Sequence, residues 1–237
     1  MQRYFVKEKD DNYLKLEKDD LHHIKNVMRN KSGDLIECIY NEKLYICKIE
    51  DTTNNNVLIV EEKEDNNELD LDITIAIALV KEQKMDLILQ KLTELGVARI
   101  IPLKMERSII KLDDKKFEKK KERWQKICKE ASEQSKRNKI PEITNMMTLK
   151  ELKNLDVDYK FVCSTKIEGN LVNNYLQDIN KCAKIIFTIG PEGGISPNEE
   201  EKLINYKYTP ISLGSRIMRV ETAAIYVASI LNFCSMR

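Results

Sequence analysis

Apolar residues recur along this chain with two different periods, and the change between them divides the sequence into two parts. Up to residue 64, short runs rich in β-branched and aromatic residues are separated by turn-forming stretches such as KSGD and TTNNN, a pattern typical of β-strands. The runs are RYFV, YLKL, DLIECIY, KLYICKIE and VLIVEE, and one helical stretch, DLHHIKNVMR, interrupts them. Residues 1–68 are therefore expected to form a small, barrel-like β domain, joined to the rest by the acidic linker DNNELDLD.

From residue 73 onward, strand-like runs alternate with helical stretches. The strands are expected at ITIAIALV, RIIPL, DYKFVCS, KIIFTIG and YTPISLG, and the shorter helices at KMDLILQKLTELGV, NLVNNYLQDI, SPNEEEKL and ETAAIYVASILNF. A longer, lysine-rich helix carries one apolar stripe. That stripe consists of Phe117, Trp124, Ile127, Cys128 and Ala131. The alternation predicts an α/β domain over residues 73–237, with a mostly parallel sheet covered by helices on both faces.

Two glycine-containing loops follow strands of this second part. The stretch TIGPEGGIS holds three of the chain's seven glycines, at positions 190, 193 and 194. Ser196, Pro197 and Glu199 are expected to begin the helix that follows, as N-cap, first residue and capping-box partner. In parallel sheets, ligands bind beyond the carboxyl ends of the strands, and glycine lets a ligand approach the backbone. The loop is neither G-x-G-x-x-G nor a P-loop, and Glu192 would repel a polyphosphate.

The second loop, LGSRIMRVETAA, places two arginines directly before an almost wholly apolar helix. Charges at the start of a buried helix need partners. One interpretation is that Arg219 and Glu221 pair within the fold. The other is that the two loops face each other across a cleft that holds a ligand, while Arg219 reaches a reacting group.

Composition excludes several classes of function. The only two histidines, His22 and His23, are adjacent and poorly placed to chelate one metal, so no metal site is expected. The sequence also has no G-x-S-x-G elbow, so a hydrolase triad is not expected either. Six scattered cysteines without a C-x-x-C pair favour a reducing compartment. No apolar stretch approaches the length of a membrane span, and the N-terminus lacks a signal-peptide pattern, so a cytoplasmic location and no membrane partner are expected.

Charge is distributed unevenly behind a net value of +1. Residues 1–64 carry 11 bases and 14 acids, whereas the run KKFEKKKERWQK (115–126) holds seven bases and two acids. Such a run is more often a solvated helix face than a binding site. Further bases follow it closely, which adds weight to a surface that faces phosphates.

Several motifs in one order resemble the RsmE family of 16S ribosomal RNA methyltransferases, within the SPOUT superfamily. They are HHIKNVMRNKSGD, KMDLILQKLTELGV, PLKMERS, RWQKI, EASEQSKR, GPEGGIS and LGSRIMRVETA. The likeness covers the whole chain. It has two mild departures, because Met218 stands where leucine is commoner in the family and Val220 where alanine is. It implies a PUA-like β-barrel domain that binds RNA, and a C-terminal domain with a trefoil knot and the cofactor S-adenosylmethionine. It also implies a homodimer that methylates N3 of a uridine in 16S rRNA of the small ribosomal subunit.

The resemblance implies roles for individual residues. Three loops would hold the cofactor through Ser164, Ile189, Gly190, Gly193, Gly194, Ser212, Leu213, Gly214, Ile217 and Met218. Arg219 would stabilise the developing uracil anion, and Glu221 or Glu192 would accept its proton. The RNA would be held by Arg3, His22, Arg29, Arg107 and Arg137, with the lysine-rich helix as a phosphate track.

Two other functions stay open on sequence grounds. One is a related methyltransferase that acts on another RNA site, such as a tRNA ribose. The other is a non-catalytic RNA-binding factor for ribosome assembly, although the intact glycine loops favour an enzyme.

Overall fold

The structure is a computed structural model, and it describes residues 1–167, 169–176 and 179–235. The chain divides into two compact units. Unit 1 comprises Met1–Glu68 together with the segment Ser132–Lys139, and unit 2 comprises Leu69–Ala131 together with Ile140–Arg237. The sequence pattern did not indicate that a segment from the middle of the chain belongs to the first unit.

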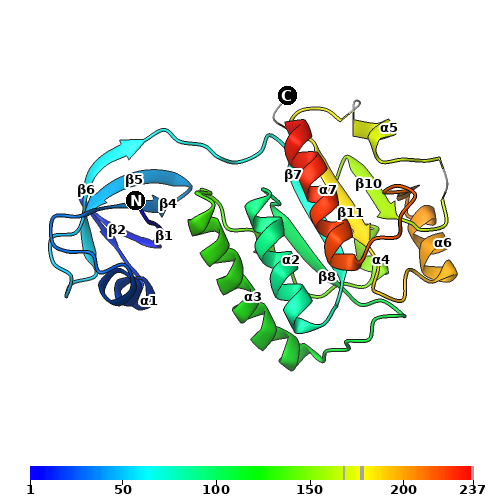
Figure 1. Cartoon of the computed structure of the whole chain (residues 1–237), viewed down its shortest axis with the longest axis horizontal. Coiled ribbons are helices and arrows are strands. Elements are labelled where there is room, and N and C mark those ends of the chain that lie inside the picture. Colours follow the sequence, from blue (N-terminus) through cyan, green and yellow to red (C-terminus); the bar gives the residue numbers. More distant parts are fainter. Residues whose placement is uncertain (168, 177–178, 236–237) are drawn as a thin grey trace. The chain divides into compact units, whose positions relative to one another are not determined.

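Unit 1 is built on one six-stranded sheet, whose strands curl in Figure 1. Its strands are β1 (Arg3–Phe5), β2 (Glu8–Asp10), β3 (Tyr13–Lys15), β4 (Leu35–Tyr40), β5 (Lys43–Lys48) and β6 (Asn56–Lys63), in the order β1-β4-β5-β6-β3-β2. The β1 strand pairs with β4 in parallel, and all other neighbours are antiparallel. The predicted helix is present as α1 (Lys18–His22), which continues into the π-helical turn η1 (His23–Val27).

Buried charges attach the segment Ser132–Lys139 to this sheet. The Arg3 guanidinium is 1% exposed and donates to Glu37 Oε2 at 2.9 Å and to Asn138 Oδ1 at 2.7 Å. Arg137, 3% exposed, pairs with Glu68 at 2.6 Å. Such groups are tolerated in an interior because each meets partners of opposite charge or polarity.

Unit 2 contains a second six-stranded sheet in which every neighbouring pair is parallel. Its strands are β7 (Asp72–Ala78), β8 (Arg99–Leu103), β9 (Glu142–Ile143), β10 (Tyr159–Cys163), β11 (Lys184–Ile189) and β12 (Thr209–Ile211), in the order β12-β10-β11-β7-β8-β9. The predicted parallel sheet is confirmed. Parallel strands point their carboxyl ends to one edge, so the loops that follow β10, β11 and β12 lie together there.

Helices cover both faces of this sheet. In Figure 1, α2 (Glu82–Glu94), α3 (Asp114–Gln134) and α7 (Val220–Ser235) lie on one face, where they share an apolar core with Ile73, Ile75 and Ile77 of β7. The short α4 (Leu149–Leu152) and α6 (Pro197–Asn205) belong to a second core that includes the alternate residues Ala76 and Ala78. The strand thus buries both faces, as its continuous apolar run predicts.

Some expectations need adjustment. The predicted helix NLVNNYLQDI is reduced to α5 (Asn173–Leu176), and its residues 177–178 lie outside the described part. The trefoil knot stays a prediction. Within the described residues, no helix has both the length and the apolar character that crossing a membrane requires.

Candidate functional site

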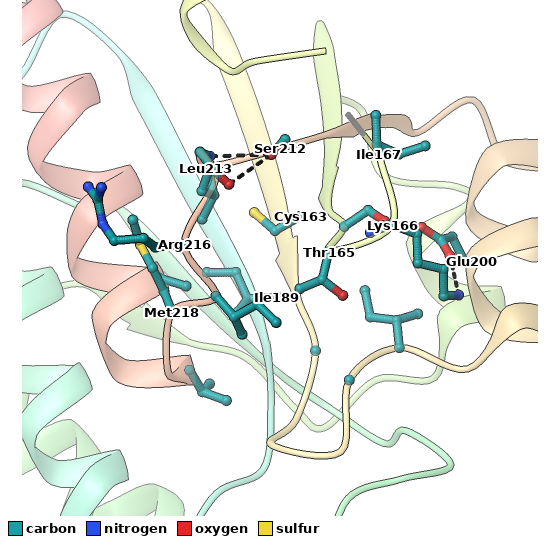
Figure 2. A pocket seen from close by; sticks show the side chains of 18 of the residues that line it. Cys163, Thr165, Lys166, Ile167, Ile189, Glu200, Ser212, Leu213, Arg216 and Met218 are labelled. Carbon is teal, nitrogen blue, oxygen red and sulfur yellow. Dashed lines mark hydrogen bonds and ion pairs between the residues drawn. The ribbon is translucent and has the colours of Figure 1, made fainter. Parts of the chain in front are cut away.

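Three loops at the carboxyl ends of β10, β11 and β12 enclose a cavity of about 600 Å³ (Figure 2). Volumes of this size are typical of small-molecule sites. Arg216 and Met218 lie toward one end of the cavity, and Lys166 and Glu200 toward the other. The predicted cleft between the glycine loops is therefore present, with the loop after β10 as its third wall.

Backbone hydrogen bonds hold the first and third loops side by side. Ser164 N–H donates to the Ile211 carbonyl at 2.9 Å, and Ser212 N–H donates to the Asn170 carbonyl at 2.8 Å. Val172 N–H donates to the Ser212 carbonyl at 3.1 Å. The cavity is thus bounded by backbone whose position is set by the sheet beneath it.

The glycines of the second loop meet two different requirements. A Cβ atom on Gly190 would lie 2.5 Å from Ile195 Cγ1, so any larger residue would force the Ile195 side chain to move. Gly194 has φ +70°, in the left-handed region that favours glycine. Both residues line the cavity, which keeps side chains away from this part of its wall.

The helix that follows this loop begins as predicted. Ser196 Oγ accepts from Glu199 N–H at 3.2 Å, and the Glu199 carboxylate accepts from Ser196 N–H at 3.1 Å. The second oxygen of Glu199 accepts from Glu106 N–H at 2.8 Å. This capping box fixes the start of α6, and with it the cavity wall.

Nine of the ten residues expected to hold a cofactor line this cavity. They are Ser164, Ile189, Gly190, Gly194, Ser212, Leu213, Gly214, Ile217 and Met218. Gly193 is in the same loop but lies against Arg107, whose Nη1 donates to the Gly193 carbonyl at 3.1 Å. Cys163 also lines the cavity, and burial raises the pKa of its thiol to about 12, so it remains protonated at neutral pH.

Lys84 brings together the two glutamates that were predicted as proton acceptors. Its Nζ lies 3.1 Å from Glu192 Oε1 and 3.4 Å from Glu221 Oε2. Burial opposes ionisation of Glu192, but hydrogen bonds from its own backbone N–H and from Lys84 lower its pKa below the usual value. The hydrogen bond to Glu192 in turn raises the pKa of Lys84. Both partners of this pair are therefore charged at neutral pH.

Arg219, the predicted catalytic arginine, lies between the cavity-lining residues Met218 and Val220. Its side chain is exposed. Within the described residues, its guanidinium makes no ion pair with Glu221, contrary to the interpretation that the two pair inside the fold. The guanidinium is thus available to a ligand from outside the chain.

The five residues expected to hold RNA fall into two groups. Arg3 and Arg137 are buried in unit 1 and bound to Glu37 and Glu68, so their guanidiniums serve the fold and are not presented to RNA. A single sequence does not distinguish a buried arginine from an exposed one. The other three, His22, Arg29 and Arg107, are exposed.

The lysine-rich helix α3 has the predicted apolar stripe, with Phe117, Trp124 and Cys128 buried. Part of its charge is paired with α2, because Arg123 binds Asp86 at 2.6 Å and Lys120 binds Glu82 at 3.0 Å. Its role as a phosphate track stays a prediction. Among the described residues, no three histidine, cysteine, aspartate or glutamate side chains lie together in a way that could hold a metal ion.

Three charged residues of the site were missed from sequence. Lys84 lies in α2, more than a hundred residues from the glutamates that it bridges. Lys166 and Glu200 line the cavity and pair at 2.6 Å. The one available signal was position, because Lys166 follows β10 within two residues of Ser164 and Glu200 lies in the first turns of α6.

The chain matches two family models, one for each part. The model of an RNA methyltransferase domain matches residues 67–232, and that of an RNA methyltransferase PUA domain matches residues 16–62. These matches, together with the parallel sheet and the cavity at its strand ends, place the chain in the class of RNA methyltransferases.

Individual relatives narrow this class. The ribosomal RNA small subunit methyltransferase E of Bacillus subtilis is 35% identical over an alignment of 247 positions, which covers 98% of this chain and 96% of the relative. A methyltransferase from Legionella pneumophila, solved with bound SAM, is 31% identical with a TM-score of 0.88 over 98% of this chain and 96% of that one. The Neisseria gonorrhoeae small subunit methyltransferase E, solved with S-adenosyl methionine, is 27% identical with a TM-score of 0.86 over 98% and 97%. The chain belongs to the ribosomal RNA small subunit methyltransferase E family.

Proposed function

We propose that this protein transfers a methyl group from S-adenosylmethionine to N3 of a uridine in 16S rRNA of the small ribosomal subunit. The observation that carries the proposal is the cavity of three strand-end loops, in a chain that is 35% identical to a ribosomal RNA small subunit methyltransferase over nearly its whole length. Two structural relatives above 25% identity were solved with this cofactor bound.

The cavity has the chemistry that S-adenosylmethionine needs. Ile189, Leu213 and Met218 offer apolar contact to an adenine ring. Gly190, Gly194 and Gly214 leave the backbone uncovered for hydrogen bonds.

The reaction on uracil requires a proton to leave N3 before the ring nitrogen can act as a nucleophile. S-adenosylmethionine, when bound, would supply the methyl group, whose bond to sulfur would break as its bond to N3 forms. Arg219, exposed and always charged, stabilises the uracil anion by donating to a ring carbonyl oxygen. Glu192 or Glu221 accepts the N3 proton, and Lys84 holds both carboxylates in place.

Substrate RNA meets both units. The target base must leave its stack to reach the cavity. Exposed His22 and Arg29 of unit 1, and Arg107 of unit 2, are the groups that hold the RNA. A location in the cytoplasm, where ribosomal subunits are assembled, accompanies this substrate.

The working form is a homodimer. A second groove, lined by Leu171, Tyr226 and Phe233, shares Ser212 and Leu213 with the cofactor cavity. Its large apolar side chains are exposed to solvent, and Phe233 is 59% exposed. Contact with a second copy would bury these side chains. Sedimentation tests this directly: we expect the wild type to sediment as a dimer and Phe233→Asp as a monomer.

The Arg219→Ala variant tests the proposed mechanism. We expect the turnover number to fall about a hundredfold with small subunits as substrate, since one preorganised charge at the anion is lost. The affinity for S-adenosylmethionine should stay unchanged. Arg99→Ala is the matched control, because Arg99 pairs with Glu142 away from the cavity. Unchanged turnover in Arg219→Ala would remove this residue from the mechanism.

A further inference from the structure

Glu200 is a buried acid in the wall of the cofactor cavity. The residue is 8% exposed, and it lines the cavity from the first turns of α6. Its Oε2 accepts from Lys166 Nζ at 2.6 Å, while Oε1 is covered and has no hydrogen-bond partner. Among the described residues that line this cavity, Glu200 alone has such an orphaned side-chain oxygen.

The neighbouring acids on the same helix show what is unusual about Glu200. Glu199 is 3% exposed, but both of its oxygens accept backbone hydrogen bonds that cap α6 and fix a loop. Glu201 is exposed to solvent. Buried polar atoms are nearly always paired, so an unpaired one beside a cavity calls for an explanation. The Glu200 carboxylate does not cap the helix. A ligand in the cavity is therefore the group that would donate a hydrogen bond to its Oε1 atom.

The charge of the Lys166–Glu200 pair indicates what kind of ligand group fits. The lysine already balances the carboxylate, so the pair is neutral overall. A ligand ammonium beside Glu200 would meet the Lys166 ammonium at close range and be repelled. A neutral hydroxyl group fits better, because it can donate to the carboxylate and accept from the lysine at once.

The position of the pair agrees with this choice. Figure 2 shows Lys166 and Glu200 apart from Arg216 and Met218, which lie toward the other end of the cavity. A hydrogen bond within the loop holds Lys166 in place, since Lys166 N–H donates to Ser164 Oγ at 3.1 Å. Glu200 lines the cavity, and the last side-chain torsion of glutamate is broad, so its carboxylate can adjust its orientation to a bound hydroxyl group.

We infer that Glu200, held by Lys166, binds the ribose hydroxyls of the cofactor. This inference rests on the proposed function, because it takes an adenosine-containing cofactor as the occupant of the cavity. It assigns a side-chain carboxylate to a site whose other walls are mostly backbone and apolar groups. The role is in binding, and no step of the methyl transfer depends on it.

The test compares two ligands on three proteins by calorimetry. The ligands are S-adenosylhomocysteine and its 2′,3′-dideoxy analogue, and the proteins are wild type, Glu200→Gln and the control Glu201→Gln. We expect Glu200→Gln to weaken S-adenosylhomocysteine binding about tenfold and to leave the dideoxy analogue unchanged. Glu201→Gln should bind both ligands as the wild type does.

The other outcomes overturn the inference in distinguishable ways. Equal loss for both ligands in Glu200→Gln would mean that the pair only supports the shape of the cavity. No loss for either ligand would mean that Glu200 does not contact the cofactor. Failure of the wild type to bind S-adenosylhomocysteine would instead contradict the cofactor of the proposed function, and the inference with it.

Discussion

Replacing Gly190 by alanine should strain the cavity wall by a predictable amount. The added Cβ would lie 2.5 Å from Ile195 Cγ1 and 3.2 Å from Ile195 N. Carbon atoms prefer about 3.5–4.0 Å, so the Ile195 side chain must move by roughly 1 Å within a packed core. Overpacking of this kind costs about 1–3 kcal/mol. A cost of about 2 kcal/mol corresponds to a fall of roughly 4–8 °C in melting temperature.

The same contact predicts a rescue by a second substitution. Ile195→Ala removes Cγ1 and by itself costs about 2–5 kcal/mol through the void that it leaves. In that background Gly190→Ala should cost far less, because the atom that it struck is gone. The two changes should therefore be less destabilising together than their sum, by about 1–2 kcal/mol.

Fluorescence of the single tryptophan is the assay for this cycle. Trp124 is 2% exposed in the core of unit 2, so its emission reports on the unit that contains the cavity. Thermal and denaturant unfolding of the four proteins gives the coupling energy. If the two substitutions were simply additive, or if Gly190→Ala were neutral on its own, the steric reasoning would be refuted.

Three further predictions follow from charged residues. Arg3→Met should destabilise unit 1 by about 3–5 kcal/mol, as removal of one partner from a buried ionic cluster does, whereas exposed Arg29→Met should change little in far-UV circular dichroism unfolding. Lys84→Met should raise the pKa of Glu192 in a carboxyl titration by NMR. In the wild type, the stability that this pair contributes is present at neutral pH and is lost as the pH falls through the lowered pKa of Glu192. The variant should therefore lose less stability on acidification than the wild type does. Arg107→Ala should reduce the salt dependence of RNA binding by about one unit of slope, and an unchanged slope would remove this residue from the RNA contacts.

Much of the second unit could be predicted from sequence because its signals are local. The continuous apolar run of β7 and the Ser196–Glu199 capping box each specify structure within a few residues, and both are found as expected. The two glycine loops were likewise placed at one edge of the sheet, since parallel strands leave no other arrangement.

The features that sequence reasoning missed depend on contacts between distant residues. Arg3 was taken for an RNA contact, but it is enclosed by Glu37 and by Asn138, which is 135 residues away in sequence. Lys84 joins Glu192 across 108 residues. The pairing of such charges is decided by packing of the folded chain, and no local pattern of polar residues records it.

The central claim, methyl transfer to N3 of uridine, is tested most directly by identifying the product nucleoside. Purified protein is incubated with isotope-labelled S-adenosylmethionine and small ribosomal subunits from a strain that lacks the modification, and the rRNA is digested for mass spectrometry. We expect the label in 3-methyluridine, and at much lower yield with Arg219→Ala. Label in a ribose-methylated nucleoside, or no label despite measured cofactor binding, would contradict the proposed reaction.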